Sequence, residues 1–208
     1  MKTRKYIIRR GQAKERFRVS IFGSARIKKN DPVYVQVRNL ARMLGKQGID
    51  VVTGGGPGIM EAANLGHEEG SKLTRNHSKS IGVGIKLPRE QKFNKYLDTR
   101  EEFVRFTSRL DRFMLLSDAV VVAPGGVGTS LELFYTWQLV QVSKKKRIPI
   151  ILLGNVWGGL LRWLRTGPLR YNYFSRDDYR MLYHAKGSKD AMRVIDRSYK
   201  DFKKRANK

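Results

Sequence analysis

The chain has 208 residues, which suits one large domain better than two small ones. Its hydrophobic content of 40%, with 3 Trp, 9 Tyr and 9 Phe, is typical of a globular protein with a buried core. Cysteine is absent, which excludes disulfide frameworks, thiolate metal sites and a cysteine nucleophile. His67, His77 and His184 are too scattered along the chain to suggest a histidine metal site or a catalytic triad.

The formal net charge of +25 is concentrated at the two ends of the chain, although the rest is basic as well. We expect a basic N-terminal extension over residues 1–17 and one domain over residues 18–208 that ends in a basic helix. A positive surface favours anionic partners, so the basic termini are candidates for contact with nucleic acid or an anionic surface. A solvated basic surface without any partner explains the charge equally well.

The sequence contains no stretch of 18 apolar residues, so no transmembrane segment is predicted. The first ten residues lack the apolar region and the small-residue cleavage site of a secretory signal. We therefore expect a cytoplasmic protein. The arginine content of the N-terminal segment leaves an organellar transit peptide as the alternative, although the segment is poor in serine.

The first half of the chain alternates short apolar runs with amphipathic segments. Val19–Phe22 is predicted to be a strand, and Asp31 followed by Pro32 is typical of a helix start. The helix that follows is expected to end near Gly45. In chain order, the next expected elements are a strand at Val51–Thr53, a helix from about Ile59 to Glu69, and a strand at Ser80–Ile85.

The second half continues the alternation after a polar loop over Pro88–Thr99. We expect, in order, a strand at Phe103–Phe106, a helix at Ser108–Leu116, a strand at Ala119–Ala123, a helix to about Val142, a strand at Ile148–Leu153, a helix near Trp157–Leu164 and a terminal helix at Ser188–Arg205. Strands that alternate with helices in this way form βαβ units. The sequence therefore predicts an α/β fold, a single Rossmann-like doubly wound parallel sheet with helices on both faces.

Three of the loops that follow predicted strands are suited to phosphate binding: Gly23–Arg26, Gly54–Gly58 and Pro124–Thr129. Glycines let backbone N–H groups approach a ligand, and the N-terminus of the next helix adds a positive dipole end. Ordinary strand-to-helix turns are the alternative explanation for each loop. None of the loops matches the P-loop or the complete dinucleotide fingerprint. A dinucleotide stays open without support from these loops, and a mononucleotide phosphate is sufficient to explain them.

Glu132 and Arg109 are the candidate catalytic residues. A carboxylate at Glu132, close to a bound phosphate, is placed to stabilise an oxocarbenium-like transition state or to position water. The alternative is a helix cap, because the run from Thr129 to Glu132 also has the pattern of a capping box. Arg109 can hold a phosphate through two hydrogen bonds, although a solvated helix residue is the ordinary alternative.

The three loops together resemble the LOG (Lonely Guy) family. The residues that carry the resemblance are Phe22-Gly23-Ser24-Ala25-Arg26, the run from Thr53 to Asn64, and Pro124-Gly125-Gly126-Val127-Gly128-Thr129 with Glu132, which fits the family signature P-G-G-x-G-T-x-x-E. The resemblance implies a Rossmann-like homodimer with its site near the interface. The implied reaction is hydrolysis of the N-glycosidic bond of a nucleoside 5′-monophosphate, AMP-like or a cytokinin riboside 5′-monophosphate, to free base and ribose 5-phosphate.

Residue by residue, the resemblance makes Glu132 and Arg109 the catalytic pair. The substrate-binding residues that we expect are Gly23, Ser24, Gly54, Gly55, Gly56, Gly125, Gly126, Val127, Gly128 and Thr129. We expect neither a metal nor a cofactor.

The chain departs from the family pattern at Leu110, Leu131 and Tyr135, where the family carries a lysine and two acidic residues. These changes leave the identity of the base open. Relatives are often labelled lysine decarboxylases, a chemistry that needs a Schiff-base lysine for pyridoxal phosphate. Because none of the motif loops contains a lysine, we reject that activity.

Two other functions stay open. A nucleotide-binding sensor or carrier of the same fold would share the phosphate loops and lack turnover. A basic nucleic-acid-binding module would use the net charge, although no recognised RNA or DNA motif occurs in the sequence.

Overall fold

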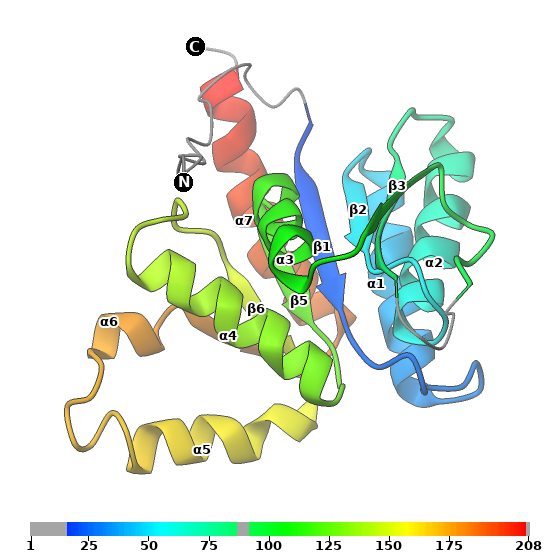
Figure 1. Cartoon of the computed structure of the whole chain (residues 1–208). Helices are drawn as coiled ribbons and strands as arrows, with labels where there is room; N and C mark the ends of the chain where they lie inside the picture. Colours follow the sequence, from blue (N-terminus) through cyan, green and yellow to red (C-terminus); the bar gives the residue numbers. More distant parts are fainter. Residues whose placement is uncertain (1–15, 87–91, 207–208) are drawn as a thin grey trace, which may run out of the picture.

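The computed structural model describes residues 16–86 and 92–206. The expected N-terminal extension over residues 1–17 therefore lies almost wholly outside the described residues, as does part of the expected loop over Pro88–Thr99. Figure 1 shows strands that mostly alternate with helices along the chain.

A seven-stranded sheet forms the centre of the molecule, in the order β4-β3-β2-β1-β5-β6-β7. The strands are β1 (Arg18–Phe22), β2 (Asp50–Thr53), β3 (Ser80–Ile85), β4 (Thr99–Phe103), β5 (Ala119–Val122), β6 (Ile150–Leu153) and β7 (Leu182–Ala185). Every neighbouring pair is parallel. The predicted parallel α/β sheet is confirmed, and β5 and β6 are buried throughout, as strands covered on both faces should be.

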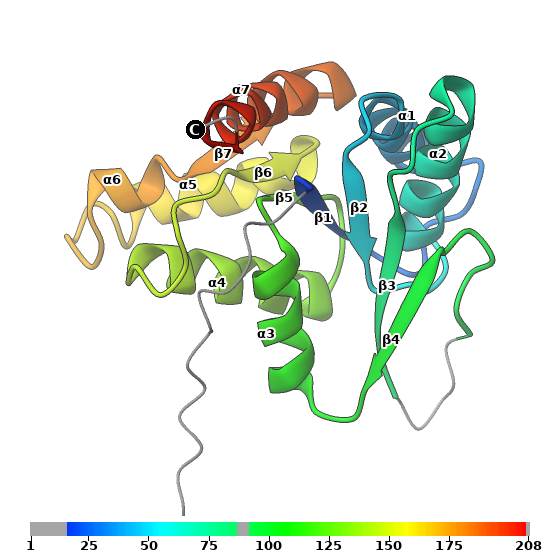
Figure 2. The same cartoon turned by 90° about the horizontal axis from the view of Figure 1, so that it is seen from above.

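Helices cover both faces of the sheet (Figure 2). One core cluster joins the sheet to α1 (Pro32–Lys46), α2 (Ile59–Thr74) and α7 (Ser188–Ala206). The other joins it to α3 (Phe106–Leu116), α4 (Val127–Gln141) and α5 (Gly158–Thr166). A 3₁₀ turn (Asn155–Trp157) precedes α5, and the short α6 (Arg176–Tyr179) precedes β7. Among the described residues, no helix combines the length and the apolar character that a membrane crossing requires.

The predicted start of α1 is confirmed. The Asp31 side chain accepts a hydrogen bond of 2.8 Å from the backbone N–H of Val33, and Pro32 occupies the first helical position.

Glycines along α2 let its backbone pack directly against the backbone of α1. A Cβ added to Gly66 would lie 2.1 Å from the carbonyl oxygen of Arg38, which is too close for any side chain.

The prediction for Phe103–Phe106 is wrong, and neither α6 nor β7 was predicted. The strand is β4, which ends at Phe103, and Phe106 already begins α3. The mostly exposed sequence of β4 is charged because it forms an edge of the sheet, so it lacks the apolar pattern that reveals a strand. The short helix α6 has no buried residue, and the two middle residues of the edge strand β7 are exposed, so neither segment shows an apolar pattern in its sequence.

The strand order places the topological switch point between β1 and β5. From β1 the chain builds β2, β3 and β4 to one side, and β5, β6 and β7 lie on the other. In open sheets of this kind, the crevice at the carboxyl ends of the two central strands binds ligands. The loops after β1 and β5 both open at that crevice.

Candidate active site

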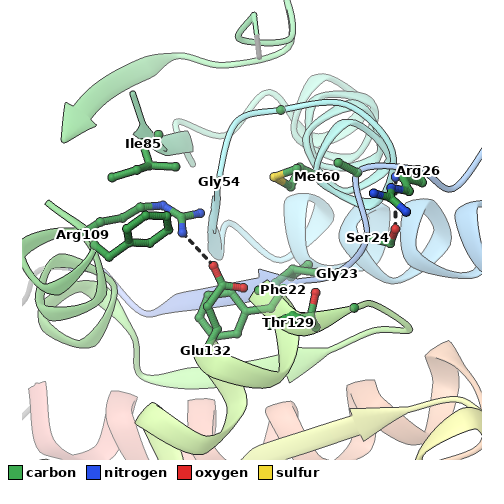
Figure 3. Close-up of a pocket in the computed structure, with 18 of the residues that line it drawn as sticks. Phe22, Gly23, Ser24, Arg26, Gly54, Met60, Ile85, Arg109, Thr129 and Glu132 are labelled. Carbon is green, nitrogen blue, oxygen red and sulfur yellow. Dashed lines mark hydrogen bonds and ion pairs between the residues drawn. The ribbon is translucent and has the colours of Figure 1, made fainter. Parts of the chain in front are cut away.

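A pocket of about 580 Å³ lies at the carboxyl ends of the central strands. Residues from all three predicted loops line it, together with Arg109 from α3 and Glu132 from α4 (Figure 3). This volume falls in the usual range for small-molecule sites. The pocket is therefore large enough for a mononucleotide.

Backbone hydrogen bonds lock the three loops to one another. The N–H of Ser24 donates to the carbonyl oxygen of Pro124 at 3.0 Å, and the N–H of Ile59 donates to the carbonyl oxygen of Ser24 at 3.0 Å. Gly58 has a φ of +67°, and a Cβ there would lie 2.5 Å from the Ser24 oxygen. The glycine thus permits the close approach of the first two loops.

A buried polar network fixes the second loop. The hydroxyl of Thr53 donates to the side-chain oxygen of Asn64 at 3.0 Å and accepts from the N–H of Gly55 at 3.0 Å. The amide of Asn64 donates to the hydroxyl of Ser80 at 2.7 Å. From the far side of the loop, the Asn94 amide donates to the carbonyl oxygens of Gly55 and Gly56. The side chains of Thr53 and Asn94 thus bond to the loop backbone, and Asn64 holds Thr53 in place, which makes the loop a preorganised wall of the pocket.

The third loop leads into an uncapped helix end. Gly126 is the N-cap of α4 and no side chain among the described residues caps it. The capping-box alternative for Thr129 and Glu132 is therefore wrong, because the helix begins before Thr129. A Cβ on Gly126 or Gly128 would meet no atom within 4 Å, so both glycines face open space. The N-terminus of α4 is thus open to an anion in the pocket.

Glu132 and Arg109 form a largely buried ion pair at the floor of the pocket (Figure 3). Nη1 of Arg109 lies 3.0 Å from Oε1 of Glu132, and the two side chains are only 12% and 10% exposed. The Nε–H of Arg109 donates to the carbonyl oxygen of Val83 at 2.9 Å, and its guanidinium lies 5.0 Å from the centre of the Phe113 ring. Arg109 is therefore not the solvated helix residue of the alternative interpretation.

Burial raises the pKa of Glu132 to about 7, against the opposing influence of Arg109. A carboxyl group with such a pKa is present in both protonation states near neutral pH. Groups of this kind, buried in a pocket beside a specific charged partner, are typical of acid–base chemistry.

Most of the predicted site residues converge. Gly23, Ser24, Gly54, Gly56, Gly126, Val127, Gly128 and Thr129 line the same pocket as Arg109 and Glu132. The remaining two, Gly55 and Gly125, have packing roles. A Cβ on Gly55 would lie 2.5 Å from the Phe93 ring, and one on Gly125 would lie 2.1 Å from the Thr129 hydroxyl.

Several lining residues were not predicted: Arg26, Met60, Phe93, Glu102 and Phe106. Arg26 and Met60 lie inside the first two loop motifs, close to the glycines, so their position in those motifs is the sequence signal for them. Phe93, Glu102 and Phe106 lie in segments without a motif. They reach the pocket because β4 pairs with β3, which the local sequence does not reveal.

The departures from the family pattern have distinct places in the fold. Leu110 is buried in the core, and Leu131 is 44% exposed on α4. The Tyr135 hydroxyl donates to a carboxylate oxygen of Asp111, which links α4 to α3. Burial, followed by the hydrogen bond and the charge of Asp111, raises the pKa of Tyr135 to about 12. Within the described residues, no group of three or more acidic or histidine side chains is arranged to hold a metal ion.

Sequence comparison finds a curated relative from Escherichia coli K12, a pyrimidine/purine nucleotide 5′-monophosphate nucleosidase. It is 28% identical over 130 residues, which are 60% of this chain and 28% of the relative. The same protein from E. coli O157:H7 matches equally well. The chain thus spans little more than a quarter of the length of these relatives.

Comparison with solved structures supports the fold. A molybdenum cofactor binding protein from Rippkaea orientalis matches with a TM-score of 0.64 and 19% identity, over 88% of this chain and 98% of that one. A structural genomics target matches with a TM-score of 0.65 and 24% identity, over 87% and 99%. The molybdenum cofactor carrier protein of Chlamydomonas reinhardtii gives 0.58 and 17%, over 88% and 98%. At these identities the likeness establishes the α/β fold alone.

A family model described as "Possible lysine decarboxylase" matches residues 57–195, well over half of the chain. The matched region contains Arg109, the third glycine-rich loop and Glu132. This match, together with the loop motifs at the switch point, shows that the chain belongs to the LOG family, to which that family model corresponds.

Proposed function

We propose that the protein hydrolyses the N-glycosidic bond of a nucleoside 5′-monophosphate to a free base and ribose 5-phosphate. The observation that carries the proposal is the buried Glu132 carboxyl group, paired with Arg109 and about one and a half helical turns from the open N-terminus of α4. The E. coli relative, a pyrimidine/purine nucleotide 5′-monophosphate nucleosidase, belongs by its name to the same reaction class.

The phosphate is proposed to bind at the N-terminus of α4. Backbone N–H groups of the segment from Gly125 to Thr129 and the helix dipole favour an anion there, and Arg109 adds a positive charge. Binding energy from this remote group then becomes available at the glycosidic bond. Free nucleosides are therefore expected to be poor substrates.

The bond that breaks joins C1′ of the ribose to a nitrogen of the base. As it lengthens, positive charge develops on the ribose, and the ionised Glu132 carboxylate stabilises it or accepts a proton from the attacking water. The water oxygen becomes bonded to C1′, and the departing base gains a proton. Arg109 orients the carboxylate through the ion pair of 3.0 Å.

Lysine decarboxylation is not supported by this site. The described residues that line the pocket include no lysine that could form a Schiff base. The family description therefore does not decide the reaction of this chain.

We further propose a homodimer that uses α4. Val127, Leu131 and Phe134 follow one another at helical spacing on that helix and are 88%, 44% and 40% exposed. The opposite side of α4, with Leu133 and Trp137, is buried in the core. A helix that is apolar on both sides is normally covered on both sides, and a second copy of the chain would cover the exposed stripe beside the pocket.

A turnover screen tests the reaction. The purified chain is incubated with AMP, GMP, CMP, UMP and isopentenyl-AMP, with the matching nucleosides as controls, and released base is measured by chromatography. We expect release from at least one monophosphate and a decrease of about 10²–10⁴-fold in Glu132→Gln, the range typical of a lost acid–base group. The matched control Glu68→Gln, on the surface of α2, should retain wild-type turnover.

Nucleotide binding without any release of base would overturn the proposal. It would favour instead a carrier or sensor that uses the same phosphate loops. Unchanged turnover in Glu132→Gln would remove Glu132 from the mechanism.

A further inference from the structure

Arginine and aromatic side chains gather on α5, at the start of α6 and on the connection between the two helices. Figure 1 shows that this connection lies away from the loops after β1 and β5. The exposed members, which we name the Arg–Tyr face, are Arg162, Trp163, Arg165, Arg170, Tyr171, Tyr173 and Arg176. Its three rings are strongly exposed: Trp163 by 56%, Tyr171 by 64% and Tyr173 by 79%. Neither the nucleotide site nor the fold explains such an accumulation.

Within residues 16–86 and 92–206, no carboxylate neutralises the positive charge of this face. Its four arginines form no ion pair with a carboxylate among the described residues. The nearby acidic residues are already engaged, because Asp177 pairs with Arg180 at 3.2 Å and Asp178 accepts from the backbone N–H of Ser175 at 2.8 Å. Every basic residue from 162 to 180 is an arginine, whose planar group both binds phosphate and stacks on aromatic rings.

The backbone presents the rings in a fixed arrangement. The N–H groups of Tyr171 and Tyr173 donate to the carbonyl oxygens of Gly167 and Pro168 at 3.1 and 2.9 Å. Asn172, between the tyrosines, has a φ of +60°. The two tyrosine rings stack with their centres 6.0 Å apart and an angle of 28° between their planes.

The segment is also anchored to the body of the protein. The Phe174 ring packs edge-on against Trp137 of α4 at 5.3 Å, and the indole N–H of Trp137 donates to the carbonyl oxygen of Asp178 at 3.0 Å. Phe174 therefore has a structural role, whereas the stacked tyrosines are directed outward without one. Because this segment is already held in place, it would lose little conformational entropy when a ligand binds.

A groove runs along this face. It has a volume of about 340 Å³, and Arg165, Arg170 and Arg176 line it together with Leu169, Asn172, Phe174 and Ser175. Three cations around a groove, with exposed aromatic rings on the same segment, suit a ligand that carries both phosphates and flat rings.

We propose that the Arg–Tyr face binds single-stranded nucleic acid. The four arginines of the face contact phosphates, and exposed bases stack on Tyr171, Tyr173 and Trp163. A single strand is favoured over a duplex because its bases expose the flat faces that stacking requires. The face is distinct from the basic termini, and the inference does not rest on the chemistry proposed for Glu132.

Fluorescence anisotropy of the full chain with labelled U12 RNA and dT12 DNA tests the proposal. Four phosphate contacts predict a salt slope of about −2.8, or roughly a 50-fold loss of affinity between 50 and 200 mM salt. Tyr171→Ala with Tyr173→Ala should weaken binding about ten-fold or more at an unchanged salt slope, since stacking carries no charge. Arg170→Gln with Arg176→Gln should reduce the salt slope by about half.

Matched controls separate this face from the general charge of the protein. Lys200→Gln with Lys204→Gln removes the same charge from exposed sites on α7, and Tyr183→Ala removes a tyrosine that is 41% exposed on β7. Both controls should bind like the wild type. Preference for RNA or for DNA would identify the natural strand, and either supports the proposal.

Three results would overturn it. Equal losses of oligonucleotide affinity in the arginine and lysine variants would indicate diffuse attraction to the whole basic surface. Wild-type affinity in the tyrosine variant would show that bases do not stack on Tyr171 and Tyr173. Binding to phosphatidylserine vesicles that depends on the same residues, without oligonucleotide binding, would indicate a membrane surface. Because the tyrosine variant keeps the nucleotide pocket, its base release separately reports on the proposed hydrolysis.

Discussion

Glu132 is a carboxyl group that the fold keeps out of water beside the guanidinium of Arg109. Burial penalises the ionised form more than Arg109 favours it, so the pKa lies at about 7. Near neutral pH the carboxyl group is therefore populated in both its ionised and its protonated form.

The proposed mechanism predicts how catalysis depends on pH. Because the ionised carboxylate is the active form, kcat/KM should fall as the pH decreases through about 7, with a loss of about ten-fold per unit well below that value. A pH series of initial rates of base release measures this dependence. The substrate phosphate also titrates, near pH 6, so binding of AMP to Glu132→Gln over the same series provides the correction. A profile that is flat between pH 5.5 and 8 would contradict the mechanism.

The free energy of unfolding should depend on pH through the same ionisation of Glu132. A carboxyl group whose pKa rises from 4.5 to about 7 on folding binds more protons in the native state, so its contribution to stability is lost as the pH increases through this window. Glu132→Gln does not titrate. From pH 5 to pH 8, the free energy of unfolding of this variant should therefore gain about 2 kcal/mol relative to the wild type.

Urea unfolding of both proteins at each pH gives this difference. The loss of the partner of Arg109 affects the variant equally at every pH and cancels from the trend. A constant difference between the two proteins would mean that Glu132 is ionised throughout the range.

At the scale of elements, glycines with different functions can be separated. Gly58 has a φ of +67° and no room for a Cβ beside Ser24, whereas Gly128 lies in the first turn of α4 with nothing within 4 Å of an added Cβ. Gly58→Ala should lower the free energy of unfolding by about 2 kcal/mol or more, because it combines an unfavourable φ with a backbone clash.

Gly128→Ala is the matched substitution, and we expect it to change stability by less than about 1 kcal/mol. Its methyl group would occupy the space proposed for the phosphate, so KM for the nucleotide should rise while the unfolding midpoint stays the same. Denaturant unfolding and steady-state kinetics on both variants distinguish the two roles. Equal effects of the two variants on stability would contradict this division.

The predictability of the elements follows their burial. Strand β5 is apolar because helices cover both of its faces, and its sequence alone reveals it. Strand β4 is charged because it lies at the sheet edge, so its pairing with β3, and not its composition, makes it a strand. The glycine-rich loops are also predictable from local sequence. Their requirement is a different one, because close approach of two backbones demands glycine itself.

At the scale of the whole molecule, the exposed stripe of Val127, Leu131 and Phe134 predicts a dimer. Leu131→Glu with Phe134→Glu should shift the chain toward a monomer, because two charges would be buried at the interface. Light scattering coupled to size-exclusion chromatography measures the mass, and Leu73→Glu, a similarly exposed leucine on α2, is the control. A monomeric wild type would remove the dimer from the proposal.

The sequence by itself determined the parallel α/β class, the three phosphate-type loops and the candidates Arg109 and Glu132. These features rest on local requirements: apolar strands, glycines at tight turns, and a motif with a fixed spacing. It did not decide between a helix cap and a site for Glu132, because that choice depends on where α4 begins.

Only the tertiary structure brought Arg109 within 3.0 Å of Glu132 and moved the pKa of that carboxyl group. It also added Phe93, Glu102 and Phe106 to the pocket and left the arginines and tyrosines between α5 and α6 on one surface. Burial and charge proximity arise from segments that are distant in sequence, so they become defined only when the sheet orders its strands.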